Sequence, residues 1–341
     1  MNRREFLGGS AATLASLAMP NVTFPSSKPK LKVARLGEDH FEIIFNEDRP
    51  MRIMQLTDTH FGIPEPGREL TDNLTFKMIK SLVDQNQPDF IFHTGDYINN
   101  DKVNPRRKPA LDLMNGLGTP WSLVFGNHDH SDGDPGSVTL DQYYGDLQNH
   151  AMGYHTGADG KRSYCFRIDL KHGKKPFATV YGFNCGGGEI PKVISAPQVA
   201  WFQAQLEADK KKKISHPILV MQHIPTLEYK LMHDAKEEVG RYGEAVCSEV
   251  DKGEIFSIYR DSGRVQGVFC GHDHVNDYVG VHQGVRLAYG RVTGWSGYGD
   301  WQRGCRMIEV NPKTQTSKTR VVLPAGVTEK PEWQITLKDD Q

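Results

Sequence analysis

The sequence lacks a long apolar run and has almost no excess of charge of either sign. A membrane-spanning helix needs about 20 consecutive apolar residues, whereas the mean hydropathy over the 341 residues is −0.54. The 41 basic and 42 acidic residues leave a net charge of −1, which argues against recognition of nucleic acid or an anionic membrane by charge alone. We therefore expect a folded globular protein with no stable membrane span and no nucleic-acid partner.

Cysteine is scarce, and its spacing excludes the common cysteine-based sites. The five cysteines are odd in number and include no Cys-x-x-Cys pair, so neither a zinc ribbon nor a disulfide framework can be derived from them. The sequence also lacks internal repeats, low-complexity blocks and any second composition regime. We therefore expect a single domain from residue 29 to residue 341.

The first 28 residues have the pattern of an export signal. Arg3 and Arg4 precede Phe6-Leu7 and a short, weakly apolar run that ends near Met19, and this pattern resembles a twin-arginine signal. A disordered N-terminus with two chance arginines is the alternative. We expect residues 1–28 to be signal peptide and linker, with the twin-arginine export machinery as partner and the periplasm or cell surface as destination.

Short apolar runs alternate with helical patterns through the rest of the chain. Runs rich in β-branched and aromatic residues predict buried strands at 52–56, 90–92, 121–125, 218–221 and 265–270, with further strands at 163–169, 177–183, 285–289 and 305–310. Helical spacing of apolar residues predicts one helix with a buried face formed by Leu74, Met78, Ile79, Leu82 and Val83. A second helix is expected from about Pro197 to Lys213.

A polar cluster follows each of the first five predicted strands. The clusters contain Asp58 and His60, then Asp96, then Asn127, His128 and Asp129, then His223, and finally His272 and His274. The carboxyl ends of the strands of an open α/β sheet are where ligands bind, so these side chains should meet at one edge. An extended backbone would send both members of each Asp-x-His or His-x-His pair to the same side.

The donor types in these clusters suit a pair of metal ions. Seven of these residues offer nitrogen or oxygen donors to a metal: Asp58, His60, Asp96, Asn127, His223, His272 and His274. Seven donors exceed the four ligands of one tetrahedral ion, and no thiolate is among them. They fit two first-row ions about 3.5–4 Å apart with one bridging carboxylate. Such a pair lowers the pKa of a bridging water and stabilises both oxygens of an in-line displacement at phosphorus.

Taken in order, the five clusters resemble the signature of calcineurin-like metallophosphoesterases, and the resemblance covers roughly residues 50–310. It implies an α/β fold, a four-layer α-β-β-α sandwich of two mixed sheets, with a dinuclear metal site at the strand C-terminal ends. The stretches 271–277 and 291–299 resemble a purple-acid-phosphatase-like subgroup with Asp-x-His in the first cluster. Because His60 and Asn99 stand where purple acid phosphatases have glycine and tyrosine, no tyrosinate–iron colour is expected.

The resemblance also implies individual roles. The first metal ion would be held by Asp58, His60 and His274, and the second by Asn127, His223 and His272. Asp96 would bridge the two ions, which would be Fe, Mn or Zn in some combination. His128 would be the acid that protonates the leaving oxygen, and Asp129 would orient it.

We predict from this resemblance an exported phosphomonoesterase that acts on a small phosphate ester, with a metal-bridging hydroxide as the attacking group. Two alternatives remain open. One is a phosphodiesterase on the same centre, acting on nucleotides or phospholipid headgroups. The other is a non-catalytic metal-binding protein that has kept the scaffold.

Three further residues are candidates for contact with substrate. His130 follows the third cluster and could line the pocket, although a solvated loop histidine is an equal alternative. Tyr298 and Arg303 lie in a glycine-rich stretch, 294–303, that could form a substrate wall with the arginine available for phosphate oxygens. Packing is the alternative reading for the aromatic residues of this stretch.

Overall fold

The computed structural model describes residues 31–62, 68–99, 107–129, 150–186 and 192–325. The chain divides into Met1–Lys30 and Leu31–Gln341, and all of the described residues belong to the second part. The predicted signal peptide and His130 lie outside the described residues. None of the helices described is both long enough and apolar enough to cross a bilayer.

Two mixed sheets form the centre of the fold. The nine-stranded sheet has the order β1-β2-β8-β9-β10-β12-β14-β13-β11, with bounds, in that order, Lys32–Arg35, His40–Ile44, Cys165–His172, Lys175–Phe183, Ile218–Gln222, Val265–Cys270, Val285–Tyr289, Val279–His282 and Glu238–Val239. The five-stranded sheet has the order β16-β15-β3-β4-β5, with bounds Ser317–Val322, Cys305–Val310, Met51–Leu56, Phe90–His93 and Trp121–Leu123. A separate two-stranded ribbon pairs β6 (His155–Thr156) with β7 (Arg162–Ser163).

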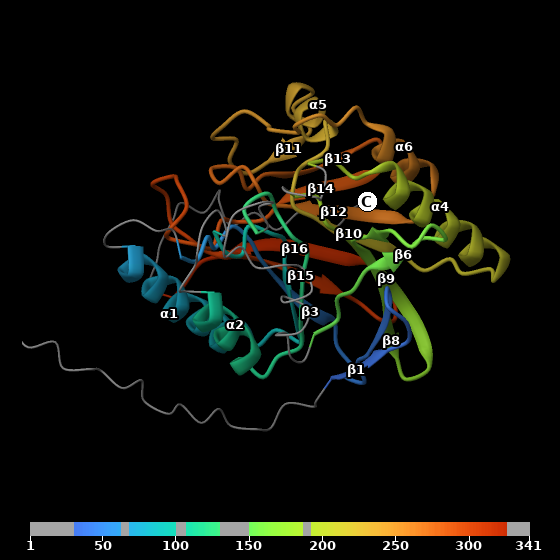
Figure 1. The fold of residues 1–341 in the computed structure, drawn as a ribbon, viewed down its shortest axis with the longest axis horizontal. Coiled ribbons are helices and arrows are strands. Elements are labelled where there is room, and N and C mark those ends of the chain that lie inside the picture. The colour runs from blue at the N-terminus through green and yellow to red at the C-terminus, as the bar shows by residue number, and fades with distance from the viewer. Residues whose placement is uncertain (1–30, 63–67, 100–106, 130–149, 187–191, 326–341) are drawn as a thin grey trace, which may run out of the picture. The chain divides into compact units, whose positions relative to one another are not determined.

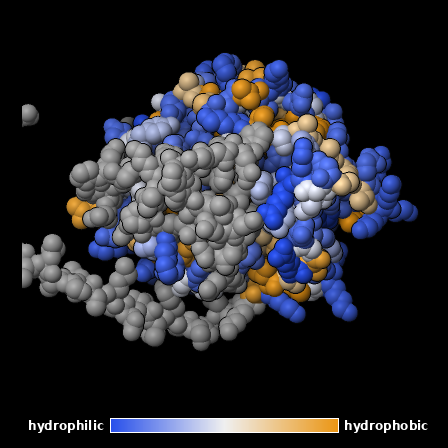
Figure 2. All heavy atoms as spheres, viewed as in Figure 1, coloured by the Kyte–Doolittle hydropathy of each residue, from blue (hydrophilic) through white to orange (hydrophobic). Residues whose placement is uncertain are grey.

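Helices cover the outer face of each sheet (Figure 1). Helices α1 (Arg68–Asn86) and α2 (Arg107–Gly116) pack on the five-stranded sheet. Helices α4 (Ala196–Lys211), α5 (Glu228–Asp234) and α6 (Glu254–Asp261) pack on the nine-stranded sheet and share a second apolar cluster with it. The fold is therefore the predicted four-layer α-β-β-α sandwich. Its outer surface, in the view of Figure 2, is mainly hydrophilic, with apolar side chains in small scattered groups.

The strands that lead to the polar clusters run parallel within each sheet. In the five-stranded sheet β4 is parallel to both β3 and β5, and in the nine-stranded sheet β10 is parallel to β12. Every strand predicted from the sequence is present, and its ends differ from the prediction by no more than three residues. Because parallel strands end on the same side, the loops that follow them are brought together.

The buried face of α1 differs from the prediction at one residue. Met78, Ile79, Leu82 and Val83 are buried as expected, but Leu74 is 52% exposed. The buried face instead includes polar residues. Asp72 accepts a hydrogen bond from the hydroxyl of Ser296, and Thr75 accepts one from the main-chain N–H of Trp295. The helix is therefore turned so that its first half contacts the loop near residue 295.

Candidate metal centre

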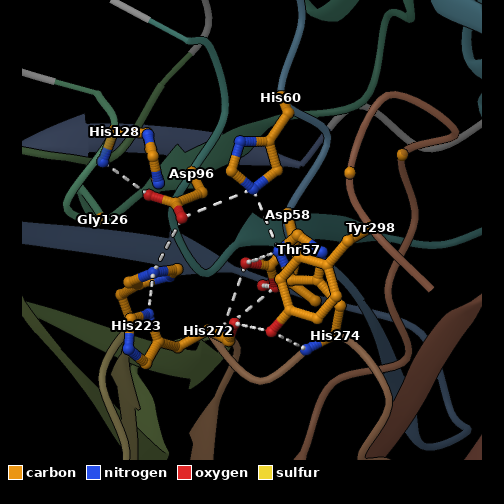
Figure 3. Close-up of polar contacts among 12 residues, drawn as sticks. Thr57, Asp58, His60, Asp96, Gly126, His128, His223, His272, His274 and Tyr298 are labelled. Atoms are coloured by element: carbon orange, nitrogen blue, oxygen red, sulfur yellow. Dashed lines mark hydrogen bonds and ion pairs between the residues drawn. The ribbon is translucent and has the colours of Figure 1, made fainter. Parts of the chain in front are cut away.

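Five loops from the two sheets meet around the Asp96 carboxylate (Figure 3). The loops after β3 and β4 are joined by main-chain hydrogen bonds from Asp58 N to Gly95 O and from His60 N to Asp96 O. In the other sheet, the loops after β10 and β12 are joined by a bond from Gly271 N to His223 O. These main-chain bonds hold the loops at a fixed spacing without any contribution from side chains.

The first donor set consists of Asp58, His60, Asp96 and His274, which are all buried and whose ligand atoms lie within 4.8 Å of one another. His60 Nε2 lies 3.0 Å from His274 Nε2 and 3.5 Å from Asp96 Oδ2. His274 Nε2 also lies 3.4 Å from Asp58 Oδ1. Two imidazole nitrogens and two carboxylates therefore face one point.

The second donor set shares Asp96 with the first and adds His223 and His272. His223 Nε2 lies 3.2 Å from Asp96 Oδ2 and 3.3 Å from His272 Nδ1. It also lies 3.2 Å from Asn127 Oδ1, which adds a neutral amide oxygen. All seven side chains predicted as metal ligands are thus brought together, and Asp96 Oδ2 faces both sets.

The surroundings of His223 fit a cation at this point. Its Nδ1 lies 2.8 Å from the Thr94 carbonyl oxygen, to which it donates, so Nε2 faces two oxygen acceptors. Burial disfavours the charged ring, but the Asp96 carboxylate outweighs burial and raises the pKa of His223 to about 10. The site therefore favours positive charge beside Nε2, which a metal ion or a proton can provide.

His60 and His272 are held in the neutral form that binds metals. Burial lowers the pKa of His60 to about 3 and that of His272 to about 4, against the opposing effect of Asp96. A neutral imidazole needs no proton release to become a ligand. Both donor sets therefore suit first-row metal ions.

The backbone is left-handed at four of the seven donors, which corrects the predicted extended geometry. The φ angles are 54° at Asp58, 46° at His60, 49° at Asp96 and 78° at His272. Each such residue costs about 1–3 kcal/mol unless its surroundings hold it, and strain of this kind clusters at functional sites. Isolated left-handed residues, and not strand alternation, bring these donors together.

Glycines beside the donors are required for two different reasons. Gly95 has a φ of 92°, a conformation that other residues rarely adopt. At Gly126 the reason is space, because a Cβ would lie 2.3 Å from Asp96 Oδ1 and 2.5 Å from Asp96 N.

His128 and Asp129 are placed differently from each other. His128 lines the cavity over the donor sets, and its main-chain N–H donates to Asp96 Oδ1 over 2.8 Å. The Asp129 carboxylate instead accepts hydrogen bonds from the main-chain N–H groups of Gly126, Tyr97 and Ile98. Asp129 therefore joins the loops after β4 and β5, and its orienting of His128 stays a prediction.

A cavity of about 560 Å³ opens over both donor sets, and Tyr298 lies on its wall. The Tyr298 hydroxyl donates to the Glu244 carboxylate, with oxygen–oxygen distances of 3.0 and 2.9 Å. The position of Tyr298 is compatible with the predicted contact to substrate. It also places the ring against His274, at a centroid distance of 3.9 Å (Figure 3).

Arg303 does not act as the predicted phosphate ligand. Its side chain is 1% exposed, and its guanidinium donates to the main-chain carbonyls of Gly294, Gly297, Tyr298, Gly299 and Trp301. The nitrogens that could contact phosphate are thus committed to the loop. Arg303 holds the conformation of residues 294–301.

Glu244 is a cavity residue that sequence reasoning missed. Asn276 Oδ1 accepts hydrogen bonds from the N–H groups of Gly243 and Glu244, and Asp277 Oδ1 accepts one from Arg241 N. Asn276 and Asp277 belong to the extended last cluster, so its sequence did carry a signal. The sequence could not show that the partner of Asn276 and Asp277 is a segment more than 30 residues earlier in the chain.

Comparison with known proteins agrees with the geometry. The family model for calcineurin-like phosphoesterases matches residues 51–276. Probable inactive purple acid phosphatase 14 of Arabidopsis thaliana is 26% identical over 313 residues, which cover 79% of this chain and 77% of that protein. Phosphatase DCR2 of Saccharomyces cerevisiae is 25% identical over 306 residues, covering 78% of this chain and 52% of that protein.

A solved structure shares the fold. The dimetal phosphatase from Danio rerio superposes with a TM-score of 0.54 at 12% identity, covering 80% of this chain and 96% of that one. At this identity the likeness concerns the fold alone, while the match to the family model spans all five polar clusters. The chain belongs to the calcineurin-like phosphoesterase family.

Proposed function

We propose that this chain is a dinuclear metal-dependent phosphomonoesterase. One observation carries the proposal. Seven nitrogen and oxygen donors from five loops converge in two sets that share Asp96 Oδ2, beneath a cavity that is also lined by His128. A carboxylate shared between two sets is what a two-metal site for in-line displacement at phosphorus requires.

The residues divide between the two ions as the donor sets do. One ion would be held by Asp58, His60 and His274, the other by Asn127, His223 and His272, and both by Asp96. Bound Fe, Mn or Zn ions would supply positive charge to the phosphoryl oxygens and would lower the pKa of a bound water.

His128 would protonate the leaving oxygen. Its main-chain bond to Asp96 Oδ1 ties its loop to the residue common to both sets, and its side chain lines the cavity. The ring is 5.0 Å, centroid to centroid, from that of His60, so it lies next to the first donor set without belonging to either set. That position suits a group that transfers a proton rather than binding metal.

A non-catalytic metal-binding role is the second candidate, because the relative from Arabidopsis thaliana is named a probable inactive purple acid phosphatase. Loss of catalysis in a metallophosphoesterase is most simply achieved by loss of a ligand. Here none of the seven donors is replaced, and all seven converge. The complete donor set is the reason for preferring the enzyme.

The test is hydrolysis by purified protein loaded with Mn²⁺, Fe²⁺ or Zn²⁺, using p-nitrophenyl phosphate and bis(p-nitrophenyl) phosphate. We expect faster turnover of the monoester, and loss of that activity in Asp96→Asn but not in the surface variant Asp261→Asn. Preference for the diester would replace the proposal with phosphodiesterase. Two bound ions without hydrolysis of either ester would favour the non-catalytic role.

We also propose that the protein is exported by the twin-arginine machinery, on the basis of Arg3, Arg4 and the apolar run that follows them. Fractionation of a bacterial host that expresses the full chain tests this. We expect the protein in the periplasmic fraction, and retention in the cytoplasm when both arginines are changed to lysine. Equal export of the double variant would contradict the proposal.

A further inference from the structure

The loop 294–303 contacts the donor His274 at four points, one of which is the hydrogen bond that the Tyr298 hydroxyl accepts from His274 N over 3.2 Å. The Tyr298 ring is stacked on the imidazole, with centroids 3.9 Å apart and planes inclined by 12°. Gly297 packs against the same ring so closely that a Cβ there would lie 2.6 Å from His274 Cε1. Trp301 Nε1 donates to the His274 carbonyl oxygen over 2.9 Å. Ring and main chain of one donor are thus both held by this loop.

His274 differs from His223 in how its ring is held. His223 has a hydrogen bond from Nδ1 to the Thr94 carbonyl, the usual means of fixing a metal-binding imidazole. His274 Nδ1 is buried and has no hydrogen-bond partner in the part of the chain that the structure describes. Its orientation therefore depends on the packing of Gly297 and Tyr298.

From this contrast we propose that Tyr298 is a positioning residue for the metal ligand His274, and that the loop 294–303 sets the affinity of the first donor set. The inference rests on the proposed function, because it assumes that the donor sets hold metal. Tyr298 acts through stacking, which replaces the missing hydrogen bond at Nδ1. The loop is then a support for a ligand in addition to any contact with substrate.

The loop has the rigidity that such a support needs. Arg303 donates to five of its carbonyl groups, as described above. The Trp301 ring contacts two guanidinium groups, with Arg291 3.4 Å and Arg241 4.4 Å from its centroid. The Tyr298 hydroxyl is held by Glu244. A side chain fixed at both ends can transmit a fixed orientation to the imidazole beneath it.

Tyr298→Ala removes the stacked ring, and Tyr298→Phe keeps the ring while removing the hydroxyl. Loss of a group that orients a metal ligand weakens metal affinity roughly 10–100-fold. We expect this loss at one of two sites in Tyr298→Ala, with the second site unchanged. Tyr298→Phe should weaken the same site less, because the stacked ring stays while the hydroxyl's bonds to Glu244 and from His274 N are lost. Calorimetric titration of metal-free protein with Zn²⁺, and the metal content after dialysis, give both affinities without measuring activity.

Tyr242→Ala is the matched control, because Tyr242 is also stacked on a histidine. Its ring lies 3.5 Å from that of His233, which belongs to neither donor set. Two sites of unchanged affinity are expected in this variant. If Tyr298→Ala fails to fold, Trp301→Phe, which removes the hydrogen bond to the His274 carbonyl, should weaken the same single site.

Unchanged binding of both ions with a raised KM would overturn the inference, because Tyr298 would then act on substrate alone. Equal weakening of both sites would also overturn it, since the loop would then support the whole fold and not one ligand. Failure of the proposed function has a different signature. It would appear in the unaltered protein, as two bound ions without hydrolysis or as no bound metal at all.

Discussion

His128 is tied to the donor sets by its main chain, while its ring belongs to neither set. Changing His128 to alanine should therefore leave both metal ions bound, because the N–H bond to Asp96 Oδ1 does not depend on the side chain. Loss of a positioned acid typically lowers turnover about 10²–10⁴-fold. We expect a fall in kcat of at least about 10²-fold, measured together with metal content by mass spectrometry. Loss of metal in this variant would make His128 a ligand and refute the assignment.

Asn127, which precedes His128, should affect metal binding when it is changed, whereas His128 should not. Asn127 Oδ1 lies 3.2 Å from His223 Nε2, so Asn127→Ala removes one oxygen from the second donor set and leaves the first set complete. We expect this variant to retain about one ion per chain after dialysis. Asn115→Ala, at the end of α2, is the control. Two retained ions in Asn127→Ala would show that the amide is not a ligand.

At the scale of elements, residue type predicted the donors but not how they meet. Carboxylate, amide and imidazole groups that follow buried strands are visible in a sequence, so all seven donors could be named from it, whereas the layers of the sandwich were implied by the family resemblance. The backbone geometry could not be predicted in the same way. Strand alternation correctly predicted that Asp58 and His60 face the same site, but it assumed an extended backbone. Both residues are left-handed, and only the surrounding loops hold that conformation.

The roles of side chains that hydrogen-bond to main-chain groups of the loops were the hardest to predict. Arg303 has a charge that suits a phosphate ligand, and Asp129 directly follows His128, yet the partners of both are main-chain groups. Nothing in the local sequence distinguishes a guanidinium that binds phosphate from one that binds carbonyl groups, because the choice depends on which segments lie nearby. Glu244 was missed for the same reason, since Asn276 reaches it from a distant part of the chain.

The loop after β5 permits a sharp test of steric constraint at the centre. A Cβ at Gly126 would lie 2.3 Å from Asp96 Oδ1, so Gly126→Ala must displace the residue shared by both donor sets. Overpacking of this kind costs about 1–3 kcal/mol, and we expect that loss in the free energy of unfolding together with weaker binding at both metal sites. Urea unfolding and metal titration measure the two effects.

Gly116→Ala is the control for that variant. Gly116 ends α2, and a Cβ there would meet nothing within 4 Å. Replacing a helical glycine by alanine stabilises by about 0.5–1 kcal/mol, so this variant should be at least as stable as the unaltered protein. Gly126→Ala with normal stability and both metal ions bound would show that the loop after β5 can move away from Asp96.

At the scale of the whole molecule, a network of buried charges joins the nine-stranded sheet to the helix that covers it. On β8, Arg167 contacts Asp169 at 2.9 Å and also reaches Asp209 of α4 at 2.7 Å. Arg264, just before β12, contacts the other oxygen of Asp209 at 2.9 Å, and His40 of β2 contacts Asp169 at 3.0 Å. The network therefore links β2, β8 and the residue before β12 to α4.

Asp169 makes part of the protein's stability dependent on pH. Burial alone would raise the pKa of Asp169, but the hydrogen bond with His40 and the charge of Arg167 outweigh it and hold the pKa well below its usual range. A carboxyl group with a lowered pKa in the folded state stabilises that state above its unfolded pKa of about 3.9, and the contribution is lost as pH falls below that value. The stability that Asp169 contributes should therefore be complete at pH 7 and smaller at pH 3.

We expect Asp169→Asn to lower the free energy of unfolding at pH 7 by roughly 3 kcal/mol or less, because Arg167 keeps Asp209 as a partner when this buried charge is removed. The difference between variant and unaltered protein should shrink between pH 5 and pH 3, as measured by urea unfolding at each pH. Taking the difference cancels the contributions of the other carboxyl groups, including those of the metal centre. Asp261→Asn, which removes a pair exposed to solvent, should show almost no difference at either pH. A difference for Asp169→Asn that stays constant across this range would mean that the network stabilises the sheet through its shape and hydrogen bonds, and not through the charge of Asp169.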